Sequence, residues 1–241
     1  MYKGKTLGIV FPTFNEEESI VQAIKDFSSH NCVDEVLVVD NNSSDLTKIL
    51  AIAAGAKCIS ESIQGYGSAS ISGLKNSQQD LVVIVEPDGT FSSKDLDVLL
   101  PYSEFNDVVF GSRTSKCLIW DHAFMPYWVR FGNLICAKMI EFLWGGPSLS
   151  DVGCTYKLFH RNSIETFINK LTVTGSHFSP HLMITCLESR LKCIEIPINY
   201  YPRIGASKIT GGNIISTIRL GIFMFFYIIF AKAKNILNTL L

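Results

Sequence analysis

The chain has 241 residues, of which 47% are hydrophobic and 18% are charged. This length suits one α/β domain with an appendage, and the hydrophobic share allows a sizeable core. The net charge of −1 gives no general attraction for nucleic acid, so binding through bulk positive charge is excluded. Seven cysteines without a CxxC pair indicate reduced thiols in a cytosolic protein, not a disulfide framework or a zinc site.

Short apolar runs alternate with helical patterns over the first 111 residues. The predicted strands are 7–11, 35–40, 57–60, 81–86 and 107–111, and the predicted helices are 16–27, 46–54, 68–76 and 94–102. Near-continuous Val and Ile in the strands indicates burial on both faces, and alternation with helices predicts a mainly parallel sheet. The apolar run 7–11 is too short for a signal peptide and is interpreted as a core strand.

The second half has a different character. Residues 117–147 are rich in aromatic side chains, and we interpret them as a second amphipathic surface. A strand is expected over 151–160, a helix over 178–189, a strand over 192–201 and a last helix from about residue 213. Without repeats or a low-complexity linker, the pattern predicts one compact domain at 1–210 and a C-terminal helical segment at 211–241.

Polar clusters follow three of the predicted strands, at 12–16, 40–45 and 86–90. Ligands of parallel sheets bind beyond the carboxyl ends of the strands, so these clusters are candidates for one site. Each also has a structural alternative. Asn15 and Glu18 fit a helix capping box, and Ser43 or Ser44 fits a cap that follows Asp40.

Glu86 and Asp88 form the sharpest signal, because two carboxylates two residues apart at a strand end can face one divalent cation. Mg²⁺ and Mn²⁺ prefer oxygen ligands and usually keep substrate phosphates in their shell. The pair therefore suits a diphosphate-bearing substrate. The alternative is a surface turn, since Pro-Asp-Gly is a good turn sequence.

Further candidates are glycines, cations and an isolated acid. The loop 64–67 precedes a helix and could approach a phosphate, whereas Arg113 and the stretch 203–208 supply cations at strand ends. The alternatives are an ordinary loop and solvated surface charges. Asp151 begins the stretch 151–159 and also fits a cap. His181 fits a general base, but a lone histidine on an apolar helix is usually structural.

Taken in order, seven motifs resemble one family. PTFNE at 12–16, VVDNNSSD at 38–45, QGYGSA at 64–69, EPDG at 86–89, GSR at 111–113, DVGCTYKLF at 151–159 and YYPRIGASK at 200–208 are similar to motifs of the dolichol-phosphate mannose synthase and polyprenyl-phosphate glycosyltransferase group of inverting GT-A enzymes. The resemblance covers about residues 6–210. It implies a Rossmann-like GT-A fold with a mainly parallel sheet flanked by helices.

The resemblance also implies a role for each matching residue. The expected nucleotide-sugar contacts are Pro12, Asn15, Glu16, Asp40, Gly67, Asp88 and Arg113. Glu86 and Asp88 match the family's Asp-x-Asp, which binds Mg²⁺ or Mn²⁺. Arg203, Ser207 and Lys208 are expected to bind acceptor or phosphate, and Asp151 and Asp88 to be catalytic.

The sequence departs from the family pattern at several of these positions. Glu86 stands where the first Asp of Asp-x-Asp is usual, and Asn41 where a second Asp follows Asp40. In the Gly-Phe-Arg motif, Thr155 occupies a small-residue position and Lys157 replaces the Arg. His181 stands where an acid is common.

The expected reaction is inverting, metal-dependent transfer of a hexose from a UDP- or GDP-sugar to a polyprenyl phosphate. A non-lipid acceptor and a catalytically silent nucleotide-sugar-binding subunit are the alternatives. The resemblance also admits a homo-oligomer or a membrane-protein subunit as partner.

The C-terminal segment indicates that the chain is located at a membrane. Residues 220–231 are twelve uncharged residues between Arg219 and Lys232, shorter than the roughly 20 needed for a span. This favours an amphipathic helix on the membrane over a transmembrane or a buried helix. The expected location is the cytoplasmic face of a membrane, as a peripheral or monotopic protein.

Overall fold

The computed structural model describes residues 1–205 and 214–240 of the chain. The strands are β1 Leu7–Thr13, β2 Glu35–Asp40, β3 Lys57–Ser60, β4 Leu81–Ile84, β5 Val108–Ser112, β6 Lys157–His160 and β7 Cys193–Pro197. The α-helices are α1 Ile20–Ser28, α2 Thr47–Ala53, α3 Tyr66–Asn76, α4 Leu96–Tyr102, α5 Tyr127–Trp144, α6 Arg161–Phe167, α7 Phe178–Glu188 and α8 Ile214–Leu240.

The strands form one mixed sheet in the order β3-β2-β1-β4-β6-β5-β7. All six pairings between neighbours would be parallel in a purely βαβ fold, but β6 runs antiparallel to both β4 and β5. The other pairings are parallel, so the prediction of a mainly parallel sheet is confirmed. Strand order reverses between β1 and β4, which is where such sheets bind ligands.

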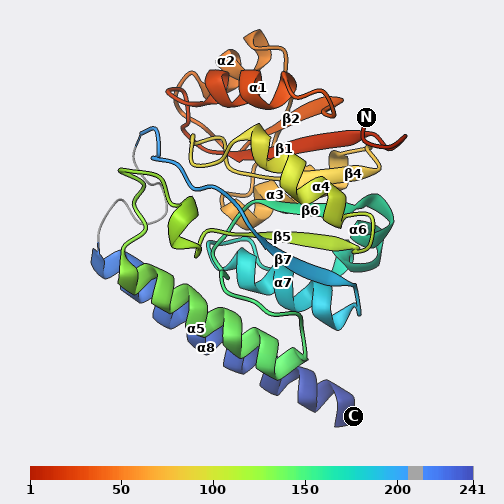
Figure 1. The fold of residues 1–241 in the computed structure, drawn as a ribbon, viewed down its shortest axis with the longest axis vertical. Helices are drawn as coiled ribbons and strands as arrows, with labels where there is room; N and C mark the ends of the chain where they lie inside the picture. The colour runs from red at the N-terminus through yellow and green to blue at the C-terminus, as the bar shows by residue number, and fades with distance from the viewer. Residues whose placement is uncertain (206–213, 241) are drawn as a thin grey trace.

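Helices cover both faces of the sheet (Figure 1). Strand residues alternate between two hydrophobic cores: Val10 of β1 packs with α3, α6 and α7, whereas Ile9 and Phe11 pack with α1, α2 and α4. This alternation is the period of a strand that is buried on both sides. The five predicted strands of the first half and their helices are present, with shifted ends.

One helix starts later than predicted. α1 begins at Ile20, after Ser19, and not at residue 16. Asn15 has a left-handed backbone, with φ of 53°, and its Oδ1 accepts a hydrogen bond from the Ser44 backbone N–H at 2.8 Å. Asn15 therefore ties two loops together, and the capping-box interpretation is wrong.

The predicted strand at 151–160 is also shorter than expected, since only its last four residues belong to β6. Residues 151–156 instead form an irregular segment, in which the Asp151 side chain accepts hydrogen bonds from Arg113 and Gly153. A chain that satisfies a buried carboxylate in this way cannot continue the alternating strand pattern.

Helices α5 and α8 lie side by side at one end of the molecule (Figure 1). On α8, Met224 and Ile228 are buried in the core formed with α5 and α7. Its other faces expose large apolar side chains, among them Phe226 and Phe230. Within the described residues, α8 is the one helix long and apolar enough to cross a membrane, and 11% of its most apolar window is buried in the molecule.

Candidate active site

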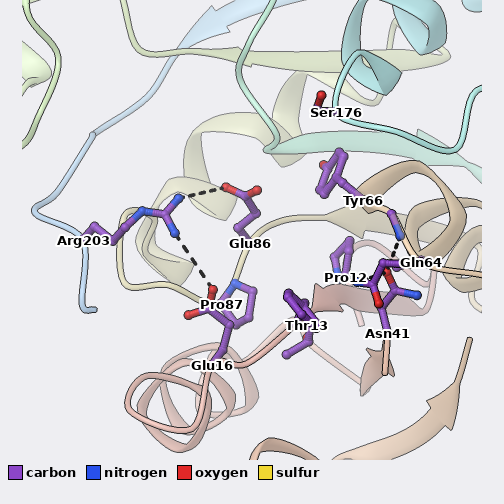
Figure 2. Close-up of a pocket in the computed structure, with 13 residues that line it drawn as sticks. Pro12, Thr13, Glu16, Asn41, Gln64, Tyr66, Glu86, Pro87, Ser176 and Arg203 are labelled. Atoms are coloured by element: carbon purple, nitrogen blue, oxygen red, sulfur yellow. Dashed lines mark hydrogen bonds and ion pairs between the residues drawn. The ribbon is translucent and has the colours of Figure 1, made fainter. Parts of the chain in front are cut away.

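A cavity of about 360 Å³ opens where strand order reverses. Its walls come from the loops after β1, β2 and β4, the start of α3, and two later segments (Figure 2). The lining residues are Pro12, Thr13, Phe14, Glu16, Asn41, Gln64, Gly65, Tyr66, Ala69, Glu86, Pro87, Ser176 and Arg203.

Asn41 organises one wall of this cavity. Its Nδ2 donates to the carbonyl oxygens of Glu61 and Ile63, at 2.9 and 2.8 Å. Its Oδ1 accepts from the Gly65 backbone N–H at 2.7 Å. An aspartate could accept from Gly65 but could not donate to the two carbonyls. Asparagine at this position therefore fastens the loop 61–65 against the end of β2.

Acidic side chains meet one arginine at the opposite wall. The Arg203 guanidinium forms an ion pair with Asp88, approaches Glu86 Oε2 at 3.6 Å and approaches Glu16 Oε1 at 4.0 Å. Figure 2 shows Arg203 between Glu86 and Glu16. Burial, and then the neighbouring charge of Asp88, raises the pKa of Glu86 to about 7. Two carboxylates at the end of β4 thus face the same cation.

The arginine is held in place through its backbone. The Tyr201 N–H donates to the Thr90 carbonyl at 3.0 Å, and the Ile204 N–H donates to the Asp88 carbonyl at 2.8 Å. Gly89 has φ of 81°, and a Cβ there would lie 2.9 Å from the Ile204 side chain. Glycine thus permits both the turn and this close approach of the two segments.

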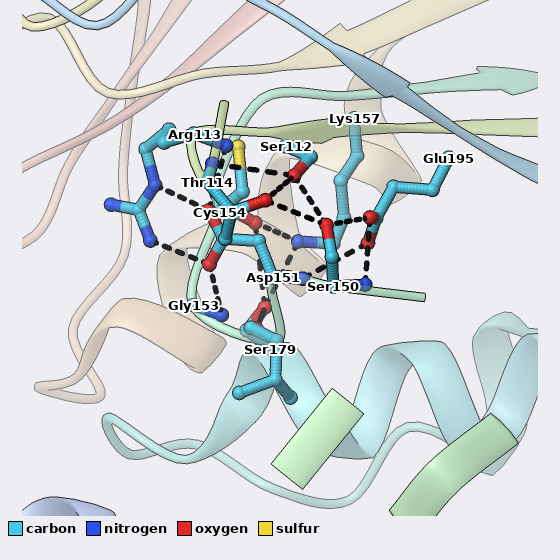
Figure 3. Close-up of polar contacts among 11 residues, drawn as sticks. Ser112, Arg113, Thr114, Ser150, Asp151, Gly153, Cys154, Lys157, Ser179 and Glu195 are labelled. Atoms are coloured by element: carbon cyan, nitrogen blue, oxygen red, sulfur yellow. Dashed lines mark hydrogen bonds and ion pairs between the residues drawn. The ribbon is translucent and has the colours of Figure 1, made fainter. Parts of the chain in front are cut away.

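Asp151 and Arg113 form a second charged group (Figure 3), and Arg113 is close enough to the cavity residues Glu86 and Tyr66 to act on their charges. Arg113 Nε donates to Asp151 Oδ2 at 2.8 Å and Nη2 donates to Oδ1 at 3.0 Å, a bidentate arrangement. The backbone N–H groups of Arg113 and Gly153 also donate to this carboxylate. Burial opposes ionisation, but the charge and hydrogen bonds of Arg113 outweigh it and lower the pKa of Asp151.

Glu195 of β7 holds the segment that carries Asp151. Its carboxylate accepts from the backbone N–H groups of Ser150 and Asp151, at 2.7 and 3.1 Å. The ammonium of the buried Lys157 donates to Ser179 Oγ at 2.9 Å and to the Cys154 carbonyl, and burial lowers its pKa. The lysine therefore cross-links the segment to α7 and does not reach the cavity.

The residues predicted from the sequence fall into three groups. Pro12, Glu16, Glu86 and Arg203 line the cavity, and Asp88 joins them through Arg203. Arg113 and Asp151 pair beside it. Ser207 and Lys208 lie outside the described residues.

Three other predicted contacts are not among the residues that line this cavity, and their role in nucleotide binding stays a prediction. Asn15 joins two loops, and Asp40 is buried with its Oδ1 accepting from the Ser43 N–H at 3.3 Å. Gly67 donates its N–H to the Thr174 carbonyl at 2.8 Å, and a Cβ on it would lie 2.4 Å from the Val173 carbonyl. None of the three lines the cavity. In the loop that contains Gly67, the lining residues are Gly65 and Tyr66.

Some lining residues were not predicted. Tyr66 belongs to the predicted glycine loop without a predicted role of its own, and Ser176 lies in a loop that contains none of the seven motifs. His181 is buried in α7, where its Nε2 accepts from the Thr172 N–H at 3.1 Å and its Nδ1 is 2.7 Å from the Tyr227 hydroxyl. Its structural interpretation agrees with these contacts.

The fold and this cavity define a class of protein. A mixed α/β sheet with a polar cavity at the strand-order reversal, and an acidic pair after the fourth strand, is consistent with the GT-A fold. The chain belongs to glycosyl transferase family 2, whose profile matches residues 8–167. The fold and the family expected from the motifs are confirmed.

Two similar proteins come from Haloferax volcanii. The chain is 31% identical over 198 residues to the glycosyltransferase AglJ, an alignment that covers 81% of this chain and 63% of AglJ. It is 28% identical over 209 residues to a dolichyl-phosphate hexose transferase, covering 86% of this chain and 88% of the relative. The chain thus spans less than two thirds of the length of AglJ.

Solved structures share the fold at lower identity. Glucosyl-3-phosphoglycerate synthase from Mycobacterium tuberculosis, in complex with Mn²⁺, uridine diphosphate and phosphoglyceric acid, superposes with a TM-score of 0.66. The two proteins are 20% identical, and the match covers 90% of this chain and 78% of the synthase. This similarity concerns the fold alone.

Proposed function

We propose that this glycosyltransferase moves a hexose from a UDP- or GDP-sugar to a polyprenyl phosphate, with inversion and with the help of Mg²⁺ or Mn²⁺. The observation that carries the proposal is the position of Glu86 and Asp88. Both carboxylates face the Arg203 guanidinium at the wall of the cavity, where the strand order reverses. A similar chain from Haloferax volcanii is a dolichyl-phosphate hexose transferase, which supports the lipid acceptor.

The side chains at this wall suit a hard divalent cation. Oδ2 of Asp88 is buried and, among the described residues, accepts no hydrogen bond beyond its ion pair with Arg203. Within the same described part of the chain, no three acidic, histidine or cysteine side chains gather as a complete metal site. Two carboxylates with substrate phosphates are the usual shell of Mg²⁺. Glu86 and Asp88 would hold the ion, which would offset the negative charge of a departing nucleoside diphosphate.

The acceptor makes a strong general base unnecessary. A phosphate monoester has a second pKa of about 6 and is mostly dianionic at neutral pH. The site must instead hold one anion close to another, which requires cations. Arg113 and Arg203 supply them, and Asp151 orients Arg113 through two hydrogen bonds. We therefore assign Asp151 a positioning role and retain Asp88 as a contact of the reacting diphosphate.

The end of the molecule formed by α5 and α8 fits a lipid substrate. Both helices expose large apolar side chains, with Tyr127 and Phe142 of α5 at 76% and 86% exposure. Aromatic and aliphatic residues on paired surface helices suit the boundary between headgroups and acyl chains. In this proposal the catalytic domain is 1–210, the segment 211–241 adds the second of these helices, and both lie on the cytoplasmic face of a membrane.

The proposal is tested by incubating radiolabelled UDP- and GDP-sugars with polyprenyl phosphate, Mn²⁺ and the protein, and then extracting with organic solvent. We expect label in the lipid phase for wild type. Asp88→Asn should retain the fold and lose transfer by about two to three orders of magnitude, as when an electrostatic group at a transition state is removed. Label confined to a water-soluble product would contradict the lipid acceptor, and unchanged turnover of Asp88→Asn would contradict the metal site.

A further inference from the structure

Arg203 occupies the place between the carboxylates that a metal ion would need. It forms its ion pair with the buried Asp88 and approaches Glu86 at 3.6 Å and Glu16 at 4.0 Å. Three acidic side chains thus lie within 4.0 Å of one guanidinium. Arginine and a divalent cation compete for the same oxygens, because both satisfy carboxylates by charge and by direct contact.

The side chain of Arg203 can leave without a change in the backbone. Hydrogen bonds from the Tyr201 and Ile204 N–H groups fix the chain on either side of it. The Arg203 side chain lines the cavity and is 27% exposed, so the cavity and the solvent lie next to the guanidinium on the side away from the carboxylates. A buried carboxylate such as Asp88 would be costly to leave unpaired, so the arginine stabilises the site while no metal is bound.

We propose that Arg203 is an internal counter-cation, which pairs with Glu86 and Asp88 until a divalent cation takes its place. This inference rests on the proposed metal site. The exchange leaves the guanidinium beside the cavity and makes metal affinity lower than the two carboxylates alone would give. Arg203 thereby sets the metal concentration at which the site is filled.

The test is the affinity for Mn²⁺ alone, measured from the electron paramagnetic resonance of free Mn²⁺ without any nucleotide. Arg203→Gln should bind Mn²⁺ about tenfold or more tightly than wild type, because coupling between close charges amounts to about 1.5 kcal/mol or more. Arg203→Lys should fall between them, since an ammonium is a point charge and pairs with one carboxylate at a time. Arg190→Gln removes an exposed arginine beyond α7 and should match wild type.

Thermal unfolding gives a second readout. Without metal, Arg203→Gln should melt below wild type, and Mn²⁺ should raise its Tm by more than it raises that of wild type. If Arg203→Gln shows no cooperative transition, Arg203→Lys carries the test. Mn²⁺ affinity equal to or weaker than wild type in the folded variants would overturn the exchange.

The outcome is separable from that of the proposed function. Metal-dependent lipid labelling by wild type, together with unchanged Mn²⁺ affinity in both Arg203 variants, would refute the exchange alone. Absence of Mn²⁺ binding in wild type and in every variant would refute the exchange and the metal site together.

Discussion

The Asp151 carboxylate accepts most of its hydrogen bonds from one arginine, Arg113. It receives two side-chain hydrogen bonds from Arg113 and two backbone hydrogen bonds, from Arg113 and Gly153. A carboxylate in this state is a poor proton acceptor, because its pKa lies below the ordinary value of 3.8. It positions a guanidinium next to the cavity, and a substitution should reveal that role in both stability and turnover.

Asp151→Asn should lower the free energy of unfolding at pH 7 by about 3–5 kcal/mol, because the buried Arg113 loses its counter-charge. It should also reduce transfer, through loss of the fixed guanidinium. Denaturant unfolding and transfer assays on the purified variant measure the two effects. Wild-type stability in this variant would contradict the positioning role.

The same carboxylate predicts a pH dependence. The pKa of Asp151 is lower in the folded chain than in the unfolded one, so the unfolded state takes up protons first as the pH falls. Its contribution to stability is complete well above pH 3.8 and is lost as the pH drops through that value toward the folded pKa. The difference between wild type and Asp151→Asn, measured by denaturant unfolding from pH 6 to pH 2.5, should therefore shrink with acidification. A constant difference would contradict the assignment.

At the scale of elements, α8 is docked on α7 through a histidine. With Nε2 of His181 accepting from the Thr172 N–H, the ring proton resides on Nδ1 and is donated to the Tyr227 hydroxyl. His177 stacks edge-on against Phe223 and lies near Tyr227. Burial, and then the charges of His177 and Lys234, lowers the pKa of His181 to about 4. Protonation would place an Nε2–H against the Thr172 N–H and weaken this contact.

The folded pKa of His181 lies below its ordinary value of 6.5, so its contribution to stability is complete above pH 6.5 and declines from there toward about 4. We expect the amides of α8 to exchange hydrogen more readily at pH 5 than at pH 7.5, after correction for intrinsic rates. His181→Gln removes the titrating group and should abolish most of this pH dependence. An equal pH slope in wild type and variant would show that another group controls the docking.

The elements differ in how far the sequence predicts them. The buried strands β1, β2 and β4 each contain a short run of mostly apolar residues, so the sequence identifies them directly. β6 was misjudged because Asp151 belongs to a turn held by Arg113, 38 residues earlier in the chain. The start of α1 was misjudged because Asn15 bonds to Ser44, a contact between loops that local propensity does not contain.

The residues of the candidate site also differ in how far the sequence predicts them. Glu16, Glu86 and Arg203 come from three distant segments, yet each follows a strand end, and the topology of a parallel sheet predicts their meeting. Tyr66 and Ser176 escaped prediction because their place at the cavity depends on the packing of α3 against the loop before α7. The resemblance predicts Gly67 as a nucleotide-sugar contact, and the sequence alone does not show that its N–H donates to the Thr174 carbonyl.

At the scale of the whole molecule, two groups of exposed apolar residues lie at opposite ends. One group is on α5 and α8, and the other is on α2, where Ile49 and Ile52 are 65% and 56% exposed (Figure 1). Membrane binding by the first group cannot be tested cleanly by deleting 213–241, since Met224 and Ile228 of α8 complete the core. Deletion would release the protein from membranes, but it would also uncover apolar surface beneath the helix.

Substitution of exposed residues on α8 tests membrane binding without uncovering the apolar surface beneath the helix. Phe226 and Phe230 are 51% and 69% exposed, so Phe226→Ser with Phe230→Ser should leave the Tm nearly unchanged. Each phenylalanine that inserts into the membrane contributes about 2 kcal/mol of binding free energy. Loss of both should lower the binding constant for anionic vesicles, measured by flotation, by two or more orders of magnitude. Ile49→Ser with Ile52→Ser is the matched control, since it removes side chains of similar exposure from the far end. Equal loss of flotation in both double variants would mean that general surface hydrophobicity, and not the face of α8, holds the protein on the membrane.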